Sequence, residues 1–384
     1  MNKHLNVAMV AAMPYPTGQG TQSLLSEMCR GLAARGHQVH LVCYHHAAFR
    51  REEPFEVHRI PGVPLYRRLR SGPDFFKPLL DAMVLARTIQ VVRRFGCQLI
   101  HAHNYEGAMA GALAAKACRV PCIYHAHNLM EDELPRYFKN RLATNLARLG
   151  GAGLDRTVPR TAGLVITLHD KLAQALCERG VSPERIRVVE PGINARFWDG
   201  KKKKDGGPLV VYAGNLDAYQ DLTVLFSAMP EVAARVPDAR LVVATMNDPE
   251  EARRLAAVCG AAAVTDVVIT PNAEDTRRVL RRARVAVSPR SSFSGFPVKN
   301  LNAQAAGLPV VACQGSAFGF EPGRTGLSVP DRDPSALAAA LVELLQDADR
   351  AHSYGQAGRR LVQERYTRER MIESIEGVWS AALV

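Results

Sequence analysis

The sequence predicts an α/β protein made of two doubly wound parallel sheets, each covered by helices on both faces. Short apolar segments rich in β-branched residues alternate with helical segments along most of the 384 residues, which is typical of βαβ units. The alternation pauses between Pro191 and Gly207, where Pro-Gly, a lysine run and Gly-Gly predict a hinge and a solvated loop. It then restarts, so the chain is divided between two domains of similar size.

The first half begins with the strand-like segment Leu5–Ala12, which is followed by a Pro/Gly loop and a helical stretch that Gly36 ends. Strands of the same kind recur after it, with helical segments between them. The further strands expected in this half are Gln38–Cys43, Leu99–His103, Cys122–His127, Gly163–Leu168 and Arg187–Glu190.

The second half repeats the alternation and ends in a helical segment over Pro334–Leu383. Ligands of doubly wound sheets bind beyond the carboxyl ends of the strands, so the loops that follow strands are where a site is expected. The strands expected in this half are Leu209–Ala213, Ala239–Ala244, Asp266–Ile269, Val285–Ser288 and Pro309–Ala312.

The composition is that of a folded protein, with 47% hydrophobic and 22% charged residues, and it excludes a disordered chain. The 49 basic and 37 acidic residues give a net charge of +12, which either calls for an anionic partner or reflects surface composition alone. No zinc-finger spacing or basic/aromatic strand pattern is found, so we expect no nucleic acid partner.

The eight cysteines include no CxxC pair, a distribution typical of a reducing compartment. Met1 leads directly into the first strand, so we expect no signal peptide, and no apolar run reaches the roughly 18 residues of a membrane span. We therefore expect a cytoplasmic protein that is able to rest on the inner face of the plasma membrane.

Residues 63–95 interleave basic and apolar side chains in a largely helical stretch, with Tyr66, Phe75 and Phe76 among several arginines and lysines. This mixture is typical either of a helix at the interface of an anionic bilayer or of a core-facing helix with a solvated basic face. The segment is therefore a candidate for peripheral membrane contact.

The loop after the first strand carries Gly18 and Gly20, and Gln22 follows in the first turn of the next helix. Glycines let a ligand approach the backbone closely, and a helix N-terminus attracts anions. The loop is therefore either an anion site or a turn without a ligand.

Two histidine pairs, His101/His103 and His125/His127, stand at the ends of strands. Residues i and i+2 share one face of a strand, so such pairs are able to ligate a metal ion. No cysteine or carboxylate spacing completes such a site, and we expect polar strand-end residues and no metal. The polar residues that follow the two pairs include Asn104, Tyr105 and Glu131.

Residues 288–302 link a strand to a helix in the second half of the chain. Ser294 and Gly295 end this loop, and a proline suits the first turn of the helix that begins near residue 297. The free N–H groups of that turn, together with Arg290 and Lys299, are suited to holding a phosphate.

With these motifs in place, the chain resembles the family 4 retaining glycosyltransferases of the GT-B fold over nearly its whole length. Residues 32–39 are similar to the family's L-rGHeV step, and residues 99–103 to its D-(V/I)-(V/I)-H-x-H strand. Residues 188–194 resemble the domain junction. Residues 294–312 resemble the signature E-G-F-x5-E followed by A-x-G-x-P-V-V-A, and residues 326–330 fit its usual continuation.

The resemblance implies two Rossmann-like domains facing each other across a cleft: an acceptor-binding domain over 1–191, a nucleotide-sugar-binding domain over 192–365, and a helix over 366–384 that crosses back to the first domain. It implies sugar transfer from a nucleotide-diphosphate donor with retention of configuration and without a metal ion or other cofactor. It also implies that His127 contacts the donor sugar at the reacting centre; the alternative is a satisfied strand-end histidine.

The resemblance assigns site residues to both domains. The donor-binding candidates are Gly18, Gly20, Asn215, Gln220, Arg290, Ser294, Gly295, Phe296, Lys299 and Asn302, and the acceptor-binding candidates are Gln22, His103, Asn104, Tyr105 and Glu131.

The chain departs from the family pattern at four positions that normally carry charge. The two signature glutamates are Ser294 and Asn302 here, and the Arg and Lys of the family's G-R-x4-K-G loop are Asn215 and Gln220. Two carboxylates and two cations are lost together, so the local charge balance is kept. This balance indicates a rewired site rather than decay.

We therefore expect a hexosyltransferase that uses a nucleotide-diphosphate sugar, UDP-linked by resemblance, with Arg290 and Lys299 as the replacement cations. The expected acceptor is a membrane lipid or a lipid-linked glycan, and a soluble acceptor is the alternative. The same replacements motivate a competing hypothesis, a catalytically degenerate GT-B protein that serves as a nucleotide-binding partner or scaffold.

Overall fold

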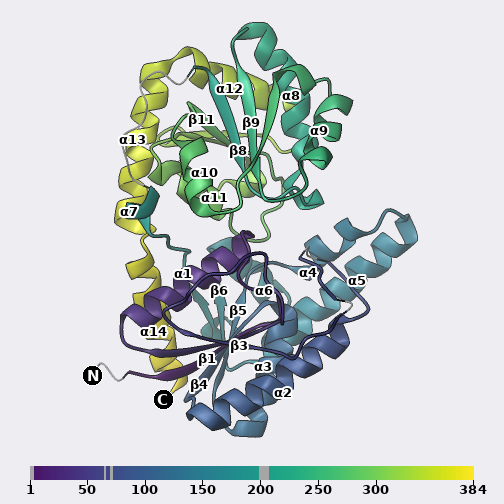
Figure 1. Cartoon of the computed structure of the whole chain (residues 1–384), viewed down its shortest axis with the longest axis vertical. Helices are drawn as coiled ribbons and strands as arrows, with labels where there is room; N and C mark the ends of the chain where they lie inside the picture. The colour runs from purple at the N-terminus through teal and green to yellow at the C-terminus, as the bar shows by residue number, and fades with distance from the viewer. Residues whose placement is uncertain (1–3, 65, 70–71, 199–206) are drawn as a thin grey trace. The chain divides into compact units, whose positions relative to one another are not determined.

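The computed structural model describes residues 4–64, 66–69, 72–198 and 207–384, and the chain divides into two compact units (Figure 1). The first unit comprises Met1–Thr17, Thr21–Gly192 and Arg368–Val384, and the second comprises Gly18–Gly20 and Ile193–Thr367. Each unit contains one parallel sheet between helices, which confirms the predicted fold class. The lysine run Lys201–Lys204, predicted to be a solvated loop, lies outside the described residues.

The sheet of the first unit has the strand order β3-β2-β1-β4-β5-β6-β7, and all of its neighbouring strands are parallel. Its central strands are continuous apolar runs that helices cover on both faces, as expected for a buried parallel sheet. The strands are β1 (Asn6–Ala11), β2 (Gln38–Cys43), β3 (Glu56–Arg59), β4 (Leu99–His103), β5 (Cys122–Ala126), β6 (Leu164–Thr167) and β7 (Ile186–Val188).

Two features of this sheet differ from the sequence prediction. The edge strand β3 was not expected, because its residues are mostly polar and only His58 is buried. The last strand, expected over Arg187–Glu190, is β7 and ends at Val188, because the chain there leads toward the unit boundary.

The helices of the first unit pack their apolar stripes on this sheet. In α2 (Lys77–Phe95), Leu80, Val84 and Val91 are buried at helical spacing, and Gly96 ends the helix in the left-handed conformation. Residues 77–95 therefore form a core-facing helix whose outer side is mixed, with Leu79 exposed among polar and small residues. The other helices are α1 (Gly20–Ala34), α3 (Asn104–Cys118), α4 (Met130–Glu133), α5 (Arg141–Thr157) and α6 (Asp170–Glu178).

The C-terminal helix α14 (Arg368–Ala382) belongs to the first unit. A Cβ atom at Gly31 of α1 would lie 2.6 Å from the Ile372 side chain, so the two helices are in close contact. Glu376 of α14 accepts hydrogen bonds from Arg35 at 2.8 Å and from the His37 ring at 2.9 Å. These contacts fix the chain's last helix against the first sheet and its helices.

The second unit has a parallel sheet of order β10-β9-β8-β11-β12-β13, again with helices on both faces (Figure 1). Its core joins the inner strands to two helices, α8 (Leu222–Arg235) and α12 (Pro334–Gln346). The edge strand β13 was not predicted as a strand. The strands are β8 (Leu209–Ala213), β9 (Arg240–Thr245), β10 (Thr265–Ile269), β11 (Val285–Ser288), β12 (Val310–Cys313) and β13 (Gly326–Val329).

The helical segment expected over Pro334–Leu383 is three helices, α12, α13 and α14, divided near Asp347 and Thr367. Asp347 accepts a hydrogen bond from the Arg350 backbone N–H and caps the second of them. The helices of the second unit are α7 (Ala195–Trp198), α8 (Leu222–Arg235), α9 (Pro249–Val258), α10 (Ala273–Leu280), α11 (Val298–Ala305), α12 (Pro334–Gln346) and α13 (Ala348–Arg365).

Candidate active site

Each sheet reverses its strand order once, between β1 and β4 in the first unit and between β8 and β11 in the second. Doubly wound sheets bind their ligands beyond the carboxyl ends of the strands at such a reversal. In the second unit, the loop after β8 carries Asn215 and Gln220, and the loop after β11 carries Arg290, Ser294 and Gly295. The fold therefore places most of the predicted donor-binding residues on two adjacent loops.

Lys299, in the first turn of α11, reaches the loop after β8. Its ammonium group donates to Gln220 Oε1 at 2.6 Å and to the Tyr212 hydroxyl at 3.1 Å, and it lies 4.2 Å from the centre of the Tyr212 ring. Gln220 Nε2 in turn donates to Asn215 Oδ1 at 2.9 Å. The structure thus brings Lys299 into contact with Gln220, which occupies a position where the resembled family has a lysine.

Arg290 approaches the same loop from the other side, with its guanidinium 5.1 Å from the centre of the Tyr219 ring. Asn215 Nδ2 donates to the Tyr219 hydroxyl at 2.8 Å, which ties this tyrosine to the loop after β8. Arg290 and Lys299 are therefore both held at the Asn215–Gln220 loop.

Three residues that sequence reasoning did not assign to the site hold the two loops together. Asp221 accepts hydrogen bonds from the Ser291 backbone N–H at 2.9 Å and the Ser291 hydroxyl at 2.6 Å, and its φ is 53°. Tyr212 donates to the Asn215 carbonyl at 2.6 Å, and Tyr219 lies beneath Arg290. Tyr212 belongs to a strand and looks like a core residue, so only the tertiary contacts reveal its part.

The electrostatics of this cluster favour an anionic ligand. Burial, and secondarily the charge of Arg290, lower the pKa of the Lys299 ammonium well below its usual range. Since a nearby anion favours the charged form of an amine, a diphosphate bound here would raise this pKa again.

The remaining candidates of the second unit occupy varied positions. Gly295 has a φ of +84°, which glycine adopts without strain, and Ser294 is buried beside it. The ring of Phe296 packs in the interior against Phe318, at 6.1 Å between ring centres, so its side chain is part of the core. Asn302 is half-buried on α11.

In the first unit, the two histidine pairs form a buried ladder on β4 and β5, in which each member is at most 4% exposed; β5 ends at Ala126, one residue before the predicted end, so His127 directly follows the strand. His101 Nε2 lies 3.1 Å from His125 Nδ1, and His103 Nδ1 lies 3.0 Å from His127 Nε2. The His101 and His103 rings stack at 4.7 Å, and the His125 and His127 rings at 4.8 Å. The predicted sharing of one strand face is therefore confirmed.

Trp379 of α14 decides the tautomers of one rung. Its indole N–H is a donor only, and it donates to His101 Nδ1 at 3.2 Å. His101 must then carry its proton on Nε2 and donate to His125 Nδ1, so His125 carries its proton on Nε2. That nitrogen is buried without a hydrogen-bond partner among the residues described by the structure.

The ladder is uncharged at neutral pH. Burial lowers the pKa of His101 and of His127 to about 3, and it lowers the pKa of His103 and of His125 well below the usual range. His127, the predicted catalytic histidine, is therefore a neutral imidazole that is able to hydrogen-bond but not to act as a cation.

Three of these rings have nitrogens within 4.8 Å of one another, those of His101, His103 and His125. The His101 and His103 rings are inclined by only 19°, and the His101 and His125 rings by 7°. Ring-nitrogen lone pairs lie in the ring plane, so those of two stacked rings run side by side instead of converging on one point. The arrangement therefore does not fit a tetrahedral metal centre.

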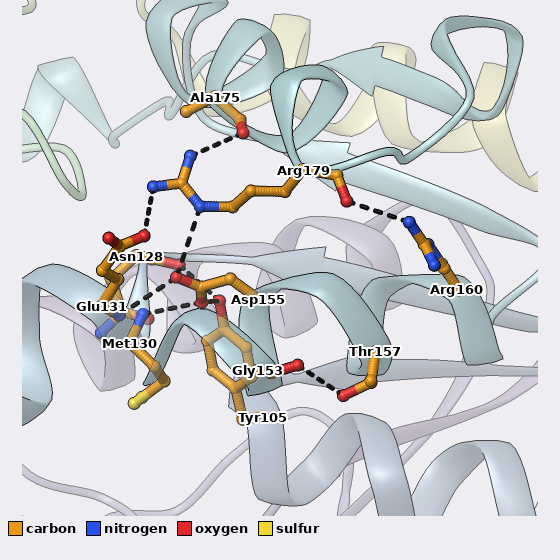
Figure 2. A network of polar contacts seen from close by, with 10 residues as sticks. All are labelled: Tyr105, Asn128, Met130, Glu131, Gly153, Asp155, Thr157, Arg160, Ala175 and Arg179. Atoms are coloured by element: carbon orange, nitrogen blue, oxygen red, sulfur yellow. Dashed lines mark hydrogen bonds and ion pairs between the residues drawn. The ribbon is translucent and has the colours of Figure 1, made fainter. Parts of the chain in front are cut away.

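Tyr105 and Glu131, two predicted acceptor-binding residues, belong to an internal polar network around Asp155 (Figure 2). Buried Asp155 accepts from the Tyr105 hydroxyl and from the backbone N–H groups of Met130 at 2.8 Å and Glu131 at 3.0 Å. Glu131 pairs with Arg179 at 2.6 Å. These contacts join α3, α4, α5 and α6, so both side chains contribute to the architecture of the unit.

The other candidates lie around the loops after β1 and β4, and two of them, Gly18 and Gly20, are grouped with the second unit. Asn104 begins α3 with a φ of 60°, and its amide approaches Met13 Sδ at 3.9 Å. Gln22 is buried in the first turn of α1, Gly20 is its first residue, and Gly18 precedes it in the loop. Asn104 therefore lies at the strand-order reversal of this sheet.

Comparison with known families agrees with both halves of this architecture. Residues 18–197 match the model of Glycosyltransferase Family 4, and residues 207–347 match the model of Glycosyl transferases group 1. Two Rossmann-like domains with parallel sheets are also the arrangement of GT-B glycosyltransferases, to which the similar solved structures belong. The chain belongs to the family 4 glycosyltransferases of the GT-B fold.

Relatives and solved structures extend over nearly the whole chain. The chain is 28% identical to a D-inositol 3-phosphate glycosyltransferase of Acidothermus cellulolyticus, over 98% of this chain and 90% of that protein. Sucrose-phosphate synthase of Thermosynechococcus elongatus superposes with a TM-score of 0.82 at 20% identity, covering 98% of this chain and 99% of that one. Anabaena HepE, in complex with UDP and glucose, gives a TM-score of 0.78 at 16% identity, covering 98% and 100%.

Among the described residues, no helix combines the length and apolarity that crossing a bilayer requires.

Proposed function

We propose that the chain transfers a hexose from a UDP-linked sugar to a lipid-linked acceptor, with retention of configuration and without a metal ion. The observation that carries the proposal is the convergence of Lys299 and Arg290 on the Asn215–Gln220 loop at the strand-order reversal of the second sheet. Two positive side chains and the start of α11 supply there the charge stabilisation that a leaving diphosphate needs.

The donor and the acceptor are inferred with help from the comparisons. HepE was solved with UDP and UDP-glucose, which supports a UDP-linked donor. WaaG, which superposes with a TM-score of 0.73, is a glycosyltransferase involved in lipopolysaccharide biosynthesis, and this supports a lipid-linked acceptor. The names of the relatives that act on inositol 3-phosphate favour a second candidate, a soluble phosphorylated sugar alcohol.

Nucleotide binding tests the proposed donor site directly. We expect UDP, but not ADP, to raise the melting temperature, and Lys299→Ala to weaken UDP binding about tenfold to a hundredfold, the usual range for a charge-assisted hydrogen bond. Arg282→Ala is the matched control, because Arg282 is an exposed cation of the same unit. Equal UDP affinity in Lys299→Ala and Arg282→Ala would refute the replacement of the family cations by Lys299.

Transfer itself is tested by incubating UDP-sugars with lipid-linked and soluble acceptors in the presence of a chelator. The proposal requires a product whose anomeric configuration, read by NMR, matches that of the donor. If UDP binds and no acceptor is glycosylated, the degenerate GT-B protein becomes the better interpretation. Transfer that stops with the chelator would overturn metal independence alone.

A further inference from the structure

Helix α5 carries a row of exposed leucines. Leu142, Leu146 and Leu149 are 68%, 60% and 71% exposed, and their i, i+4, i+7 spacing places them on one side of the helix. Single exposed leucines are ordinary, but a row of them on one helix marks an interaction surface. We call these three residues the leucine face.

The C-terminal part of the same helix is firmly held. Asp155 is fully buried and accepts the backbone N–H groups at the start of α4 (Figure 2). Gly151 packs so closely on α4 that a Cβ atom there would overlap the Met130 carbonyl. The half that carries the leucine face extends away from the sheet (Figure 1) and begins at Asn140, which caps it by accepting the Leu142 backbone N–H at 2.8 Å.

The segment that carries the leucine face has charged residues of one sign only. Residues 134–154 contain no aspartate or glutamate, and their charged residues are Arg136, Lys139, Arg141 and Arg148. Lys139, Arg141 and Arg148 are exposed. Leucines on one face of a helix, bordered by arginines and lysines without acidic residues, are typical of helices that lie in the interface of an anionic bilayer.

We infer that the leucine face of α5 docks the protein on a membrane surface that contains anionic lipids. A second copy of the chain fits this surface less well, because self-association through it would bring the same positive charges together. The inference deepens the proposed function and rests on it, because the proposed lipid-linked acceptor gives the protein a reason to dock on a membrane. Docking itself needs neither donor nor acceptor.

Flotation with vesicles tests the inference on the full chain without substrates. Wild-type protein should float with phosphatidylglycerol-containing vesicles, float much less with pure phosphatidylcholine, and bind less as the salt concentration rises from about 0.05 M to about 0.5 M. The triple variant Leu142→Ser/Leu146→Ser/Leu149→Ser should lower the bound fraction by roughly fivefold or more. An unchanged melting temperature shows that this variant is folded.

Two further variants sharpen the comparison. Leu113→Ser/Val258→Ser removes exposed apolar side chains elsewhere and should bind like wild type. Phe75→Ser/Leu79→Ser removes the two most exposed large apolar side chains that the structure describes in residues 63–95, the segment that the sequence favours, and should also retain binding.

Several outcomes would overturn the inference. Wild-type protein that binds no vesicle, or a triple variant that binds as well as wild type, excludes docking through the leucine face. Loss of binding only in Phe75→Ser/Leu79→Ser would assign membrane contact to residues 63–95. A dimer that the triple variant abolishes, seen by analytical ultracentrifugation without vesicle binding, would assign the face to a second copy. Each of these results leaves the UDP-binding test of the proposed function unaffected.

Discussion

Lowering the pH from about 7.5 to about 5.5 is expected to destabilise the first unit by about 3 kcal/mol or more. The reason is that the buried ladder histidines stay neutral in the folded protein, whereas the same histidines bind protons in the unfolded chain. Burial lowers the pKa of His101 and His127 to about 3, whereas a free imidazole titrates near about 6.5. At pH about 5.5 each of these two histidines then costs about 1.4 kcal/mol of stability. His103 and His125, whose pKa values are lowered in the same direction, add to the loss.

The sign of the effect follows from proton linkage. A histidine with a lowered folded-state pKa binds fewer protons when folded, so stability is complete above about pH 6.5 and falls steadily as the pH drops toward about 3. Burial also lowers the pKa of His40, His46 and His58, which strengthens the same trend, whereas burial raises the pKa of Asp81 to about 6, which opposes it in part because the folded state then binds the proton more tightly. A variant that lacks one ladder histidine should show the effect directly: the free energy of unfolding of His125→Gln should depend less steeply on pH than that of the wild-type protein.

Urea unfolding of a single-tryptophan variant measures the stability of the first unit, which contains the ladder. Trp379 contacts His101 in the first unit, whereas Trp198 lies in the second, so Trp198→Phe leaves fluorescence that reports on the ladder. His352→Gln is the control, because His352 is exposed and belongs to the second unit. Equal urea midpoints at the two pH values, with equal slopes, would refute a neutral buried ladder.

Two further predictions concern close packing at glycines and the hydrogen bonds of a buried carboxylate. Gly355→Ala should destabilise the second unit by about 1–3 kcal/mol, because the new methyl group would overlap the Gly307 carbonyl. Gly377→Ala is also within a helix but places its methyl group in open space, so it should stabilise the protein by about 0.5–1 kcal/mol. Asp155→Asn should cost roughly 2–3 kcal/mol, because an amide oxygen replaces a carboxylate that accepts three hydrogen bonds. Thermal and urea unfolding measure both.

The sequence predicts the inner strands well, because buried parallel strands are continuous apolar runs and turn residues bound them. Leu99–His103 and Val285–Ser288 were predicted at the residues where they occur. The edge strands β3 and β13 escaped prediction for a physical reason. An edge strand is partly exposed and has a neighbour on one side only, so its residues need not be apolar.

The candidate site is predictable to the extent that it depends on topology. Strand order places the loops of Asn215 and Arg290 side by side, so the rule that loops after strands carry ligands was sufficient there. The bonds between Lys299 and Gln220 and between Asp221 and Ser291 join residues about 70 or more positions apart. No local sequence pattern predicts contacts between residues that lie so far apart in the chain. The same holds for Trp379, which reaches His101 from the last helix of the chain.

Helices α2 and α5 show why an amphipathic sequence does not by itself reveal an interaction surface. Both alternate leucines with arginines, and the sequence drew attention to residues 63–95 for that reason. In α2 the sheet and α3 cover Leu80, Val84 and Val91, so most of the apolar face is buried by folding and Leu79 is the one large apolar side chain of this helix that stays exposed. In the half of α5 that carries the leucine face the protein buries only the small residue Ala147, and Leu142, Leu146 and Leu149 stay exposed. A membrane surface therefore has to be sought where folding has left several apolar side chains uncovered on one helix face, and the three exposed leucines of α5 meet that condition.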